Sequence, residues 1–452
     1  MLGDRVGWKK YLHPFLYKEL PAGTGWYATL GTLCALLFGV MVVSGLFLAM
    51  YYNPSPDKAY VSIDYIIHSV PMGSVLRGIH HWSASAMIIA VLLHLLTNLF
   101  SGTYRAPREG TWIAGVCLLL ISLGLGFTGY LLPWDLKSYW ATVVGSNIPD
   151  SIPLVGGFLT RLIRGGDTVS GLTLTRFYAM HMLLLPAILT GLIVVHLYLV
   201  RVHNLTECGL QPGPESKLYR FFPEHLFRSA IVFLSVFIAI LLFAIFVEPP
   251  RESVAGTLAP SYLPRPEWYY MWLFQLLTLF SGPWESLASI AIPAGVIAAL
   301  FALPFLSTGR QRPLVVAATV SCLVGFAYLT LMGFEGARPY GQVIPIPRRS
   351  LTASESRGLH LYAIQQCAYC HQIRGKGGHR TGPDLSNVRA KHRTLAYLAA
   401  YIRDARRISP HSIMPKYDLP AQDLQALADF VLALDFSRYP EKVLKREEVL
   451  KQ

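Results

Sequence analysis

The 452 residues are 53% hydrophobic and only 14% charged, and the net charge is +13. Soluble globular proteins carry about 25% charged residues, so this composition excludes an ordinary soluble enzyme. It favours a membrane protein with several spans and leaves room for a further domain.

Seven long apolar stretches follow one another in the first 334 residues, most of them near the ~20 residues that cross a hydrocarbon core. We predict transmembrane helices at 26–51, 78–100, 112–132, 177–200, 228–247, 286–306 and 313–334. Basic residues gather in alternate connections between these spans, for example at Lys18, Arg105, Arg201 and Arg312. By the positive-inside rule these connections are cytoplasmic, so the basic excess is a topology signal, and the odd number of spans places the C-terminus outside.

Spans two and four each contain two histidines, His80 with His94 and His181 with His196. A histidine within a span is costly and by default functional, although any single one could be a hydrogen-bonded core residue. Separations of fourteen and fifteen residues leave the side chains about 40° and 60° apart around the helix, with ~21 Å between levels. The same arithmetic puts His81 about 140° from His94, so we assign it no ligand role.

Spans two and four run in the same direction, so we predict an outer pair, His80 with His181, and an inner pair, His94 with His196. Each pair can supply both axial ligands of a low-spin haem, which is closed to substrates and suited to electron transfer. A metal ion between such pairs would normally recruit carboxylates or thiols, and none are near. The spacing therefore predicts two haem levels.

Glycines at matching positions could make room for the porphyrins. Gly31 and Gly45 in span one, and Gly115 and Gly129 in span three, are also fourteen residues apart within each helix. Glycine lets a flat ligand approach the backbone closely, although small residues also mediate helix packing in lipid. Arg77, one turn before the first histidine of span two, could pair with a haem propionate or extend to the membrane interface.

The composition changes after the last span. Residues 335–349, EGARPYGQVIPIPRR, are rich in Pro, Gly and Arg and are typical of a linker. Residues 350–437 contain amphipathic stretches with helical spacing, which predicts a small helical domain. Within it, CAYCH at 367–371 is the attachment signal of a c-type haem, and a disulfide between the two cysteines is the alternative.

Three segments of the membrane part, RGIHHWSASAMIIAVLLH, GFTGYLLPWDLKSYW and LTLTRFYAMHMLLLPAILTGLIVVH, resemble the haem-carrying half of cytochrome b, the core of the quinol-oxidising cytochrome bc complexes. RPEWYYMWLFQLL and IPAGVIAALFALPFL resemble its other half. The likeness covers about residues 8–334 and is closest to the plastoquinol-oxidising branch, in which the two halves are separate chains. Here they look fused, and residues 353–435 resemble a class I cytochrome c.

The spans and the resemblance together predict an all-α fold: a four-helix dihaem bundle, three further transmembrane helices and a helical cytochrome c domain. The expected division is a dihaem bundle at 1–220, a three-helix part with the quinol-site loop at 221–334, a linker at 335–349 and the cytochrome c domain at 350–452. The resemblance implies two non-covalent b haems, each held by a histidine pair, and one covalent haem c.

In the tail, the resemblance implies that Cys367 and Cys370 form the thioethers and that His371 is one axial ligand. TGPDL, at 381–385, looks like the segment that supports this histidine. Met414, in SIMPKYDLP, looks like the sixth ligand, although a methionine before a proline could also be an ordinary core residue. The next candidates for that ligand are His379, His392 and His411.

The resemblance also implies a quinol-oxidising site beside the motif Pro266-Glu267-Trp268-Tyr269, on the outer face. Oxidising a quinol releases two electrons and two protons, so the site needs a group that accepts a proton. A sheltered carboxylate can do this, and Glu267 is our candidate. Tyr269 and Tyr130 would shape the pocket, while an exposed glutamate elsewhere would be only a solvated charge.

One feature of the plastoquinol branch is missing. That branch anchors an additional haem near the inner quinone site through a cysteine early in the first span. The aligned position here is near Thr29, and Cys34 lies more than a turn deeper. We therefore predict no covalent fourth haem, although Arg201 resembles a residue that lines that pocket.

The resemblance implies a subunit of a quinol-cytochrome c reductase that translocates protons in a Q cycle. The expected partners are a Rieske-type iron-sulfur protein, a mobile cytochrome c or terminal oxidase as acceptor, and a second copy of the complex. The expected location is a bacterial cytoplasmic membrane, with the N-terminus cytoplasmic and the cytochrome c domain on the outer face. The alternative is a dihaem membrane anchor that relays electrons for a dehydrogenase without oxidising quinol itself.

Overall fold

The computed structural model divides into two compact units, residues 1–257 with 264–331 and residues 258–263 with 332–452, and each is described by itself. The structure describes residues 13–21, 25–152, 154–203, 218–255, 265–280, 284, 286–307, 311–335, 343–365, 367–377, 382–386, 388–391, 393–409, 412, 414 and 416–451.

Seven helices in the described part of the chain are long and apolar enough to cross a membrane, which confirms the predicted number of spans. Such segments must be helical because the backbone groups can be satisfied only within the segment. The spans are Trp26–Ala49, Gly73–Ser101, Glu109–Tyr130, Gly171–His203, Phe221–Phe246, Leu287–Leu306 and Arg312–Phe334.

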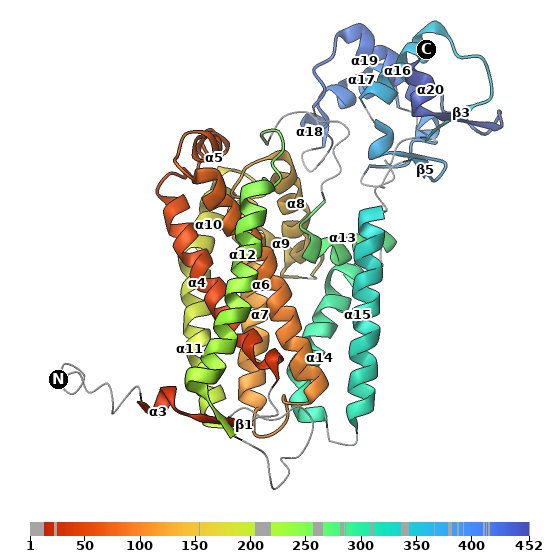
Figure 1. Cartoon of the computed structure of the whole chain (residues 1–452). Coiled ribbons are helices and arrows are strands. Elements are labelled where there is room, and N and C mark those ends of the chain that lie inside the picture. The colour runs from red at the N-terminus through yellow and green to blue at the C-terminus, as the bar shows by residue number, and fades with distance from the viewer. Residues whose placement is uncertain are drawn as a thin grey trace. The chain divides into compact units, whose positions relative to one another are not determined.

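The first four spans provide the helices that carry the paired histidines and glycines. Their elements are α4 (Leu30–Ala49), α6 (Gly73–Ser101), α7 (Glu109–Tyr130), α10 (Gly171–Ala179) and α11 (Leu185–His203). Helix α4 packs along α6, and α11 packs along α7 (Figure 1). The remaining spans contain α12 (Leu226–Phe246), α14 (Ile292–Leu306) and α15 (Arg312–Glu335).

Specific contacts hold the later spans against this bundle. Gly78 of α6 lies so close to α12 that a Cβ at position 78 would stand 2.8 Å from the Cα of Ala244. The indole Nε1–H of Trp112, on α7, donates to the carbonyl of Leu300 on α14 at 2.7 Å. The second half of the membrane unit is thus anchored directly to the histidine-bearing helices.

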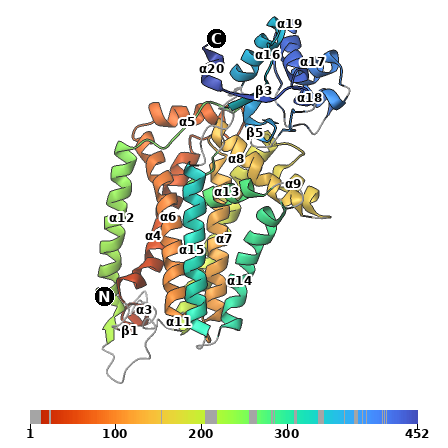
Figure 2. The ribbon, with the colours of Figure 1, turned by 90° about the vertical axis from the view of Figure 1, so that its right-hand side faces the viewer.

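Shorter elements lie at the two ends of the bundle (Figures 1 and 2). At one end are α5 (Ala59–His68), α8 (Leu136–Asn147), α9 (Gly156–Arg164) and α13 (Met271–Leu279). At the other end are α3 (His13–Leu16) and the antiparallel pair β1 (Glu19–Pro21) and β2 (Leu218–Arg220). The described parts of the connections between spans three and four and between spans five and six therefore lie at the same end of the bundle.

Asp135 ties these two connections together. One oxygen of its carboxylate caps α8 by accepting from the backbone N–H of Ser138 at 2.8 Å. The other accepts from the backbone N–H of Glu252 at 3.2 Å. The N–H of Leu136 also donates to the carbonyl of Ser253 at 2.8 Å. The segment after span three is thereby fixed beside the segment that leads to the Pro-Glu-Trp-Tyr motif.

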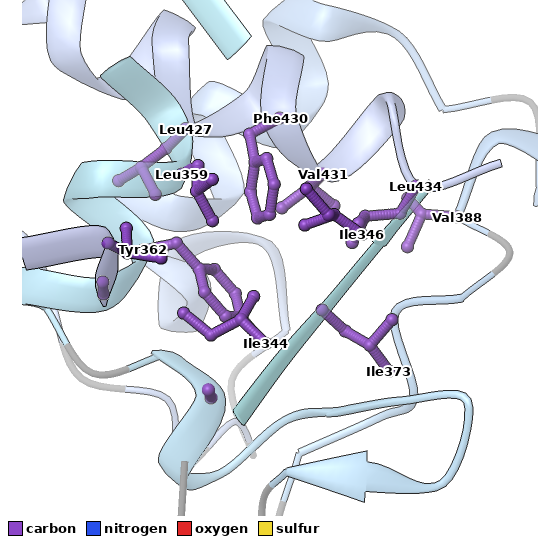
Figure 3. Close-up of a cluster of buried hydrophobic side chains, with 13 residues drawn as sticks. Ile344, Ile346, Leu359, Tyr362, Ile373, Val388, Leu427, Phe430, Val431 and Leu434 are labelled. Atoms are coloured by element: carbon purple, nitrogen blue, oxygen red, sulfur yellow. The ribbon is translucent and has the colours of Figure 1, made fainter. Parts of the chain in front are cut away.

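The second unit is a small helical domain around one apolar core, as predicted. Its elements are β3 (Val343–Pro347), α16 (Ala353–Ile364), β4 (Gln372–Ile373), β5 (Lys376–Gly377), α17 (Leu395–Arg403), α18 (Ala405–Ile408), α19 (Ala421–Leu432), β6 (Glu441–Lys445) and α20 (Arg446–Leu450). Tyr362 of α16 and Phe430 of α19 meet in the core, with ring centroids 5.3 Å apart (Figure 3). At Gly358 the two helices pass so closely that a Cβ would lie 2.6 Å from the Cβ of Phe430.

The expected linker at 335–349 differs from the structure in its second half. Residues 343–347 form β3, which pairs antiparallel with β6, and 336–342 lie outside the described residues. Ile344 and Ile346 are buried in the core of the unit (Figure 3). The VIPIP sequence alternates apolar residues with proline, and its pairing with a strand about one hundred residues later has no local signal.

Candidate functional site

The four span histidines form two pairs at two levels. The ring centroids of His80 and His181 lie 6.2 Å apart, and those of His94 and His196 lie 6.5 Å apart. Two imidazoles that share one metal, each bound at about 2.0–2.1 Å, have centroids about 6.4 Å apart. The described residues contain no group of three or more His, Cys, Asp or Glu side chains placed to hold a metal ion. The donor set therefore fits a cofactor that needs two protein ligands, such as haem.

Hydrogen bonds orient three of these rings. His181 Nδ1–H donates to the carbonyl of Leu125 at 3.1 Å, and His196 Nδ1–H donates to the carbonyl of Thr111 at 3.0 Å. Such a bond fixes the tautomer and leaves the lone pair of Nε2 for a metal. His94 Nδ1 is buried and has no partner among the described residues.

Ser44 orients the third ring, that of His80. Its hydroxyl donates to the carbonyl of Val40 at 2.7 Å, so it accepts from His80 Nδ1–H, which lies 3.0 Å away. This arrangement again leaves Nε2 of His80 available. The sequence analysis missed this serine, whose only signal is its position immediately before Gly45.

A π-helical turn explains the unequal histidine spacing. Residues Met180–Leu184 form this turn between α10 and α11, and it contains His181. A π turn holds about one residue more than an α turn. The fifteen residues from His181 to His196 in span four thus give nearly the same rotation and rise as the fourteen from His80 to His94 in span two. Both helices therefore present their histidines at corresponding levels.

The four predicted glycines each face one of these histidines. A Cβ at Gly45 would lie 3.1 Å from Cε1 of His80, and a Cβ at Gly129 would lie 2.9 Å from Nδ1 of His181. At the inner level, a Cβ at Gly31 would lie 3.4 Å from His94, and one at Gly115 would lie 3.4 Å from His196. At the outer level the glycines make room for the imidazole rings themselves, while at the inner level a Cβ would reach the edge of ordinary contact. This is a more specific role than the porphyrin clearance expected from the spacing.

Arg77, Arg201 and Cys34 lie in the same unit. Arg77 donates through Nη1 to the carbonyl of Pro249 at 3.3 Å and lines a cavity with His80. The carbonyl of Arg201, in the last turn of α11, accepts from the ammonium of Lys18 at 2.8 Å. Cys34 packs in an apolar cluster around α4 and α6.

A partly open cavity of about 300 Å³ joins the outer histidine pair to the Pro-Glu-Trp-Tyr motif. Besides His80 and His181, the residues that line it include Glu267, Tyr269 and Tyr130. Pro266 and Trp268 are not among the described lining residues, and Trp268 instead packs edge-on against Tyr269, with centroids 5.5 Å apart.

A lysine that sequence reasoning missed also lines this cavity. Lys137 Nζ lies 3.2 Å from Oε1 of Glu267, and only 20% and 15% of the two side chains are exposed. The ammonium also lies 5.4 Å from the ring centroid of Tyr130, whose hydroxyl donates to the carbonyl of Arg265 at 3.2 Å. A basic residue on a connection predicted to lie outside, against the positive-inside rule, was the available signal.

In the second unit, the structure places His371 of the Cys-x-x-Cys-His motif beside Gly382 and Pro383 of the TGPDL segment. His371 Nδ1–H donates to the carbonyl of Pro383 at 2.8 Å, and a Cβ at Gly382 would lie 2.6 Å from that nitrogen. None of the described cysteines is joined in a disulfide. Burial, followed by the neighbouring Cys370, raises the pKa of the Cys367 thiol to about 12. The bond at Nδ1 leaves Nε2 of His371 available for a metal.

Two tyrosines surround this motif. The Tyr362 hydroxyl is buried and has no hydrogen-bond partner among the described residues, as expected where a bound polar group completes the site. Burial raises the pKa of Tyr417, and the nearby thiols of Cys367 and Cys370 raise it further. Tyr417 follows Met414 in one loop, so this loop approaches the cysteines. Met414 itself is partly buried, while the alternatives His379, His392 and His411 lie outside the described residues.

The prediction that Met414 is the sixth ligand of a c haem has a direct test. Replacing Met414 by histidine should keep that haem attached and low-spin and lower its potential, because a thioether favours reduced iron. The expected fall is on the order of 0.2 V, within the range of about 0.8 V that axial ligands span. A redox titration of the purified chain, followed in the c-haem absorbance, measures it. An unmoved potential would exclude Met414 as the sixth ligand.

Comparison with known proteins identifies both units. Residues 18–204 match the family model of cytochrome b/b6/petB, and residues 353–431 match that of the cbb3-type cytochrome c oxidase subunit III. A cytochrome bc complex cytochrome b subunit from Chlorobaculum thiosulfatiphilum is 38% identical over 61% of this chain and 65% of its own length, just under two thirds. The menaquinol:cytochrome c reductase cytochrome b subunit of Bacillus subtilis is 45% identical over 37% of this chain and 75% of its own length.

A solved structure of a hyperthermophilic respiratory complex III aligns with a TM-score of 0.65 and 27% identity, over 74% of this chain and 90% of its own. Its likeness agrees with the helical architecture described above. The two family matches imply haem b in the first unit and haem c in the second. With seven membrane-spanning helices in its described part, the chain is an integral membrane protein of the cytochrome b/b6 family that carries a cytochrome c domain in the same polypeptide.

Proposed function

We propose that this chain is the core subunit of a bc-type quinol:cytochrome c oxidoreductase. It would oxidise quinol at an outer-face site and use two b haems and one c haem, with proton translocation in a Q cycle. The observation that carries the proposal is the single cavity that joins the outer histidine pair to Glu267 and Tyr269. A dihaem anchor that only relays electrons needs the histidine pairs but has no use for a carboxylate in that cavity.

The assignments of individual residues are part of this proposal. His80 with His181 and His94 with His196 would hold the two b haems, and Cys367, Cys370, His371 and Met414 would hold the c haem. Bound haem supplies one-electron transfer. Glu267 would accept a proton from the quinol, while Tyr269 and Tyr130 would shape the cavity, and Arg77 would face a propionate.

The assembly and location are proposed on the same basis. The described cysteines offer no ligand set for an iron-sulfur cluster, so a Rieske-type partner subunit would take one electron from the quinol. The c domain would pass that electron to a mobile cytochrome c or an oxidase. We place the complex, as a dimer, in a bacterial cytoplasmic membrane with the c domain on the outer face.

Replacing Glu267 by glutamine removes the titratable group and keeps its shape, so quinol-dependent reduction of the c haem should slow about 100-fold. The assay uses the purified complex with menadiol, a naphthoquinol, and with decylubiquinol, a benzoquinol. The b-haem spectra should hardly change.

The matched control is Glu248→Gln, an exposed glutamate just beyond α12, which should keep wild-type turnover. Wild-type rates in Glu267→Gln between about pH 6 and 9 would remove Glu267 from the mechanism. Failure of the unaltered complex to oxidise either quinol would instead favour the electron-relay anchor.

A further inference from the structure

The lysine in the cavity has a defined relationship to the proposed proton acceptor. Lys137 lies in the first turn of α8, and Glu267 precedes the turn at Trp268–Tyr270. Their side chains meet at 3.2 Å and are largely buried. Within the described chain, Lys137 is the only basic side chain in ion-pair contact with Glu267.

Such a pair has a cost that a surface pair does not have. Removing two charges from water is unfavourable, and a buried ion pair often contributes little net stability. A lysine has a long flexible stem and can usually turn its ammonium toward water. Here its ammonium instead lies 3.2 Å from Glu267, a carboxylate that shares the cavity with His181 and Tyr269. This placement favours a role in the reaction over one in stability.

We propose that Lys137 is a positioning residue that holds Glu267 as a carboxylate at the cavity wall and releases it when it takes up a proton. The inference rests on the proposed function, in which Glu267 receives that proton. The ammonium, 3.2 Å away, attracts the carboxylate and limits the movement of its side chain. Before quinol arrives, the acceptor is thus held in one place at the cavity wall.

The proposed step moves one proton from the quinol to Glu267. The quinol O–H bond breaks, its proton forms an O–H bond with a carboxylate oxygen of Glu267, and the electron pair stays on the quinol oxygen. The electrons then leave the quinol singly, to the one-electron acceptors named above. The neutral acid no longer attracts the ammonium as an ion, so the Glu267 side chain is free to turn and carry its proton away.

Other titratable groups face Glu267 and are unchanged in the test variants. His81 approaches it from α6 and Tyr269 from its own turn, each close enough for electrostatic interaction. Tyr130 of α7 and Asp135, which caps α8, line the same cavity. A change in pH dependence that follows substitution of Lys137 is therefore attributable to the lysine.

The test measures the rate of menadiol oxidation by the purified complex between about pH 5 and 9 in Lys137→Met, Lys137→Gln and Lys137→Arg. Without the ammonium, protonated Glu267 persists to higher pH, and only the carboxylate accepts a proton. The acidic limb of the profile should therefore move up by about one pH unit in the Met and Gln variants. Lys137→Arg keeps the positive charge and should therefore show the wild-type pH profile.

The double variant Lys137→Met with Glu267→Gln separates the two proposals. It should behave as Glu267→Gln alone, because the lysine acts through the carboxylate. An unmoved acidic limb in both neutral variants, with normal b-haem spectra, would overturn the role of Lys137 and leave that of Glu267 intact. A shift that persists in the Glu267→Gln background would also overturn it. Wild-type turnover in Glu267→Gln alone would remove Glu267, and Lys137 with it, from the mechanism. Failure of the unaltered complex to oxidise menadiol would defeat the proposed function itself.

Discussion

Replacing Cys367 and Cys370 together by alanine should remove all covalently bound haem from the chain. The two thiols are the only cysteines in a Cys-x-x-Cys-His motif, and they lie beside a histidine whose Nδ1–H donates to the carbonyl of Pro383. A denaturing gel stained for haem should show one attached group in the wild type and none in the variant. Acid acetone should still extract two b haems from both proteins.

The matched control for this prediction is the pair Cys117→Ala and Cys322→Ala, whose cysteines lie within the spans. It should keep the full haem stain. A stain that survives loss of Cys367 and Cys370 would point to another covalent site, for which Cys34 is the nearest candidate to the expected position. Extraction of only one haem would contradict the two-level arrangement of the histidines.

Replacing Gly129 by alanine should displace His181 and reduce the extractable b haem from two groups to about one. The new Cβ would lie 2.9 Å from Nδ1 and 3.1 Å from Nε2 of the ring, closer than a Cβ normally lies to other heavy atoms. The ring cannot move away without losing its bond to the carbonyl of Leu125. Loss of such a supporting bond typically lowers metal affinity about 10–100-fold.

Gly124→Ala is the matched control on the same helix, because a Cβ there would meet only Leu185, at an ordinary 3.7 Å. It should keep both b haems. The measurement is the haem content of the purified chain by acid acetone extraction, with a redox titration of the absorbance. Two extractable haems with unmoved potentials in Gly129→Ala would show that the outer pair does not depend on this glycine.

The sequence predicted the features that depend on local pattern. A span needs only an apolar run of sufficient length, and a histidine pair on one face follows from the helical repeat. The structure accordingly has the seven predicted spans and brings each of His80 and His94 next to its expected partner. The motif around Cys367 was recognisable because its ligands are adjacent in the chain.

Features that depend on distant pairing escaped prediction. Lys137 meets Glu267 across 130 residues. Its place on an outer connection marks it as unusual, but no local pattern indicates which residue it meets. The burial of Ile344 beside β6 likewise depends on a strand near the other end of the cytochrome c domain. The role of Gly129 was underestimated because spacing reports which positions are equivalent but not which ring faces them.

The π-helical turn at Met180–Leu184 has a consequence for how the chain can change over generations. One inserted residue in an α-helix rotates everything beyond it by about 100°, which would change the relative orientation of His181 and His196. A π turn absorbs that residue locally, so the rest of the helix keeps its register. Descendants could therefore lose one residue at this turn and revert to a continuous α-helix while His181 and His196 remain on one face. We therefore expect related chains to differ in length by one residue at this turn and at few other points in the span.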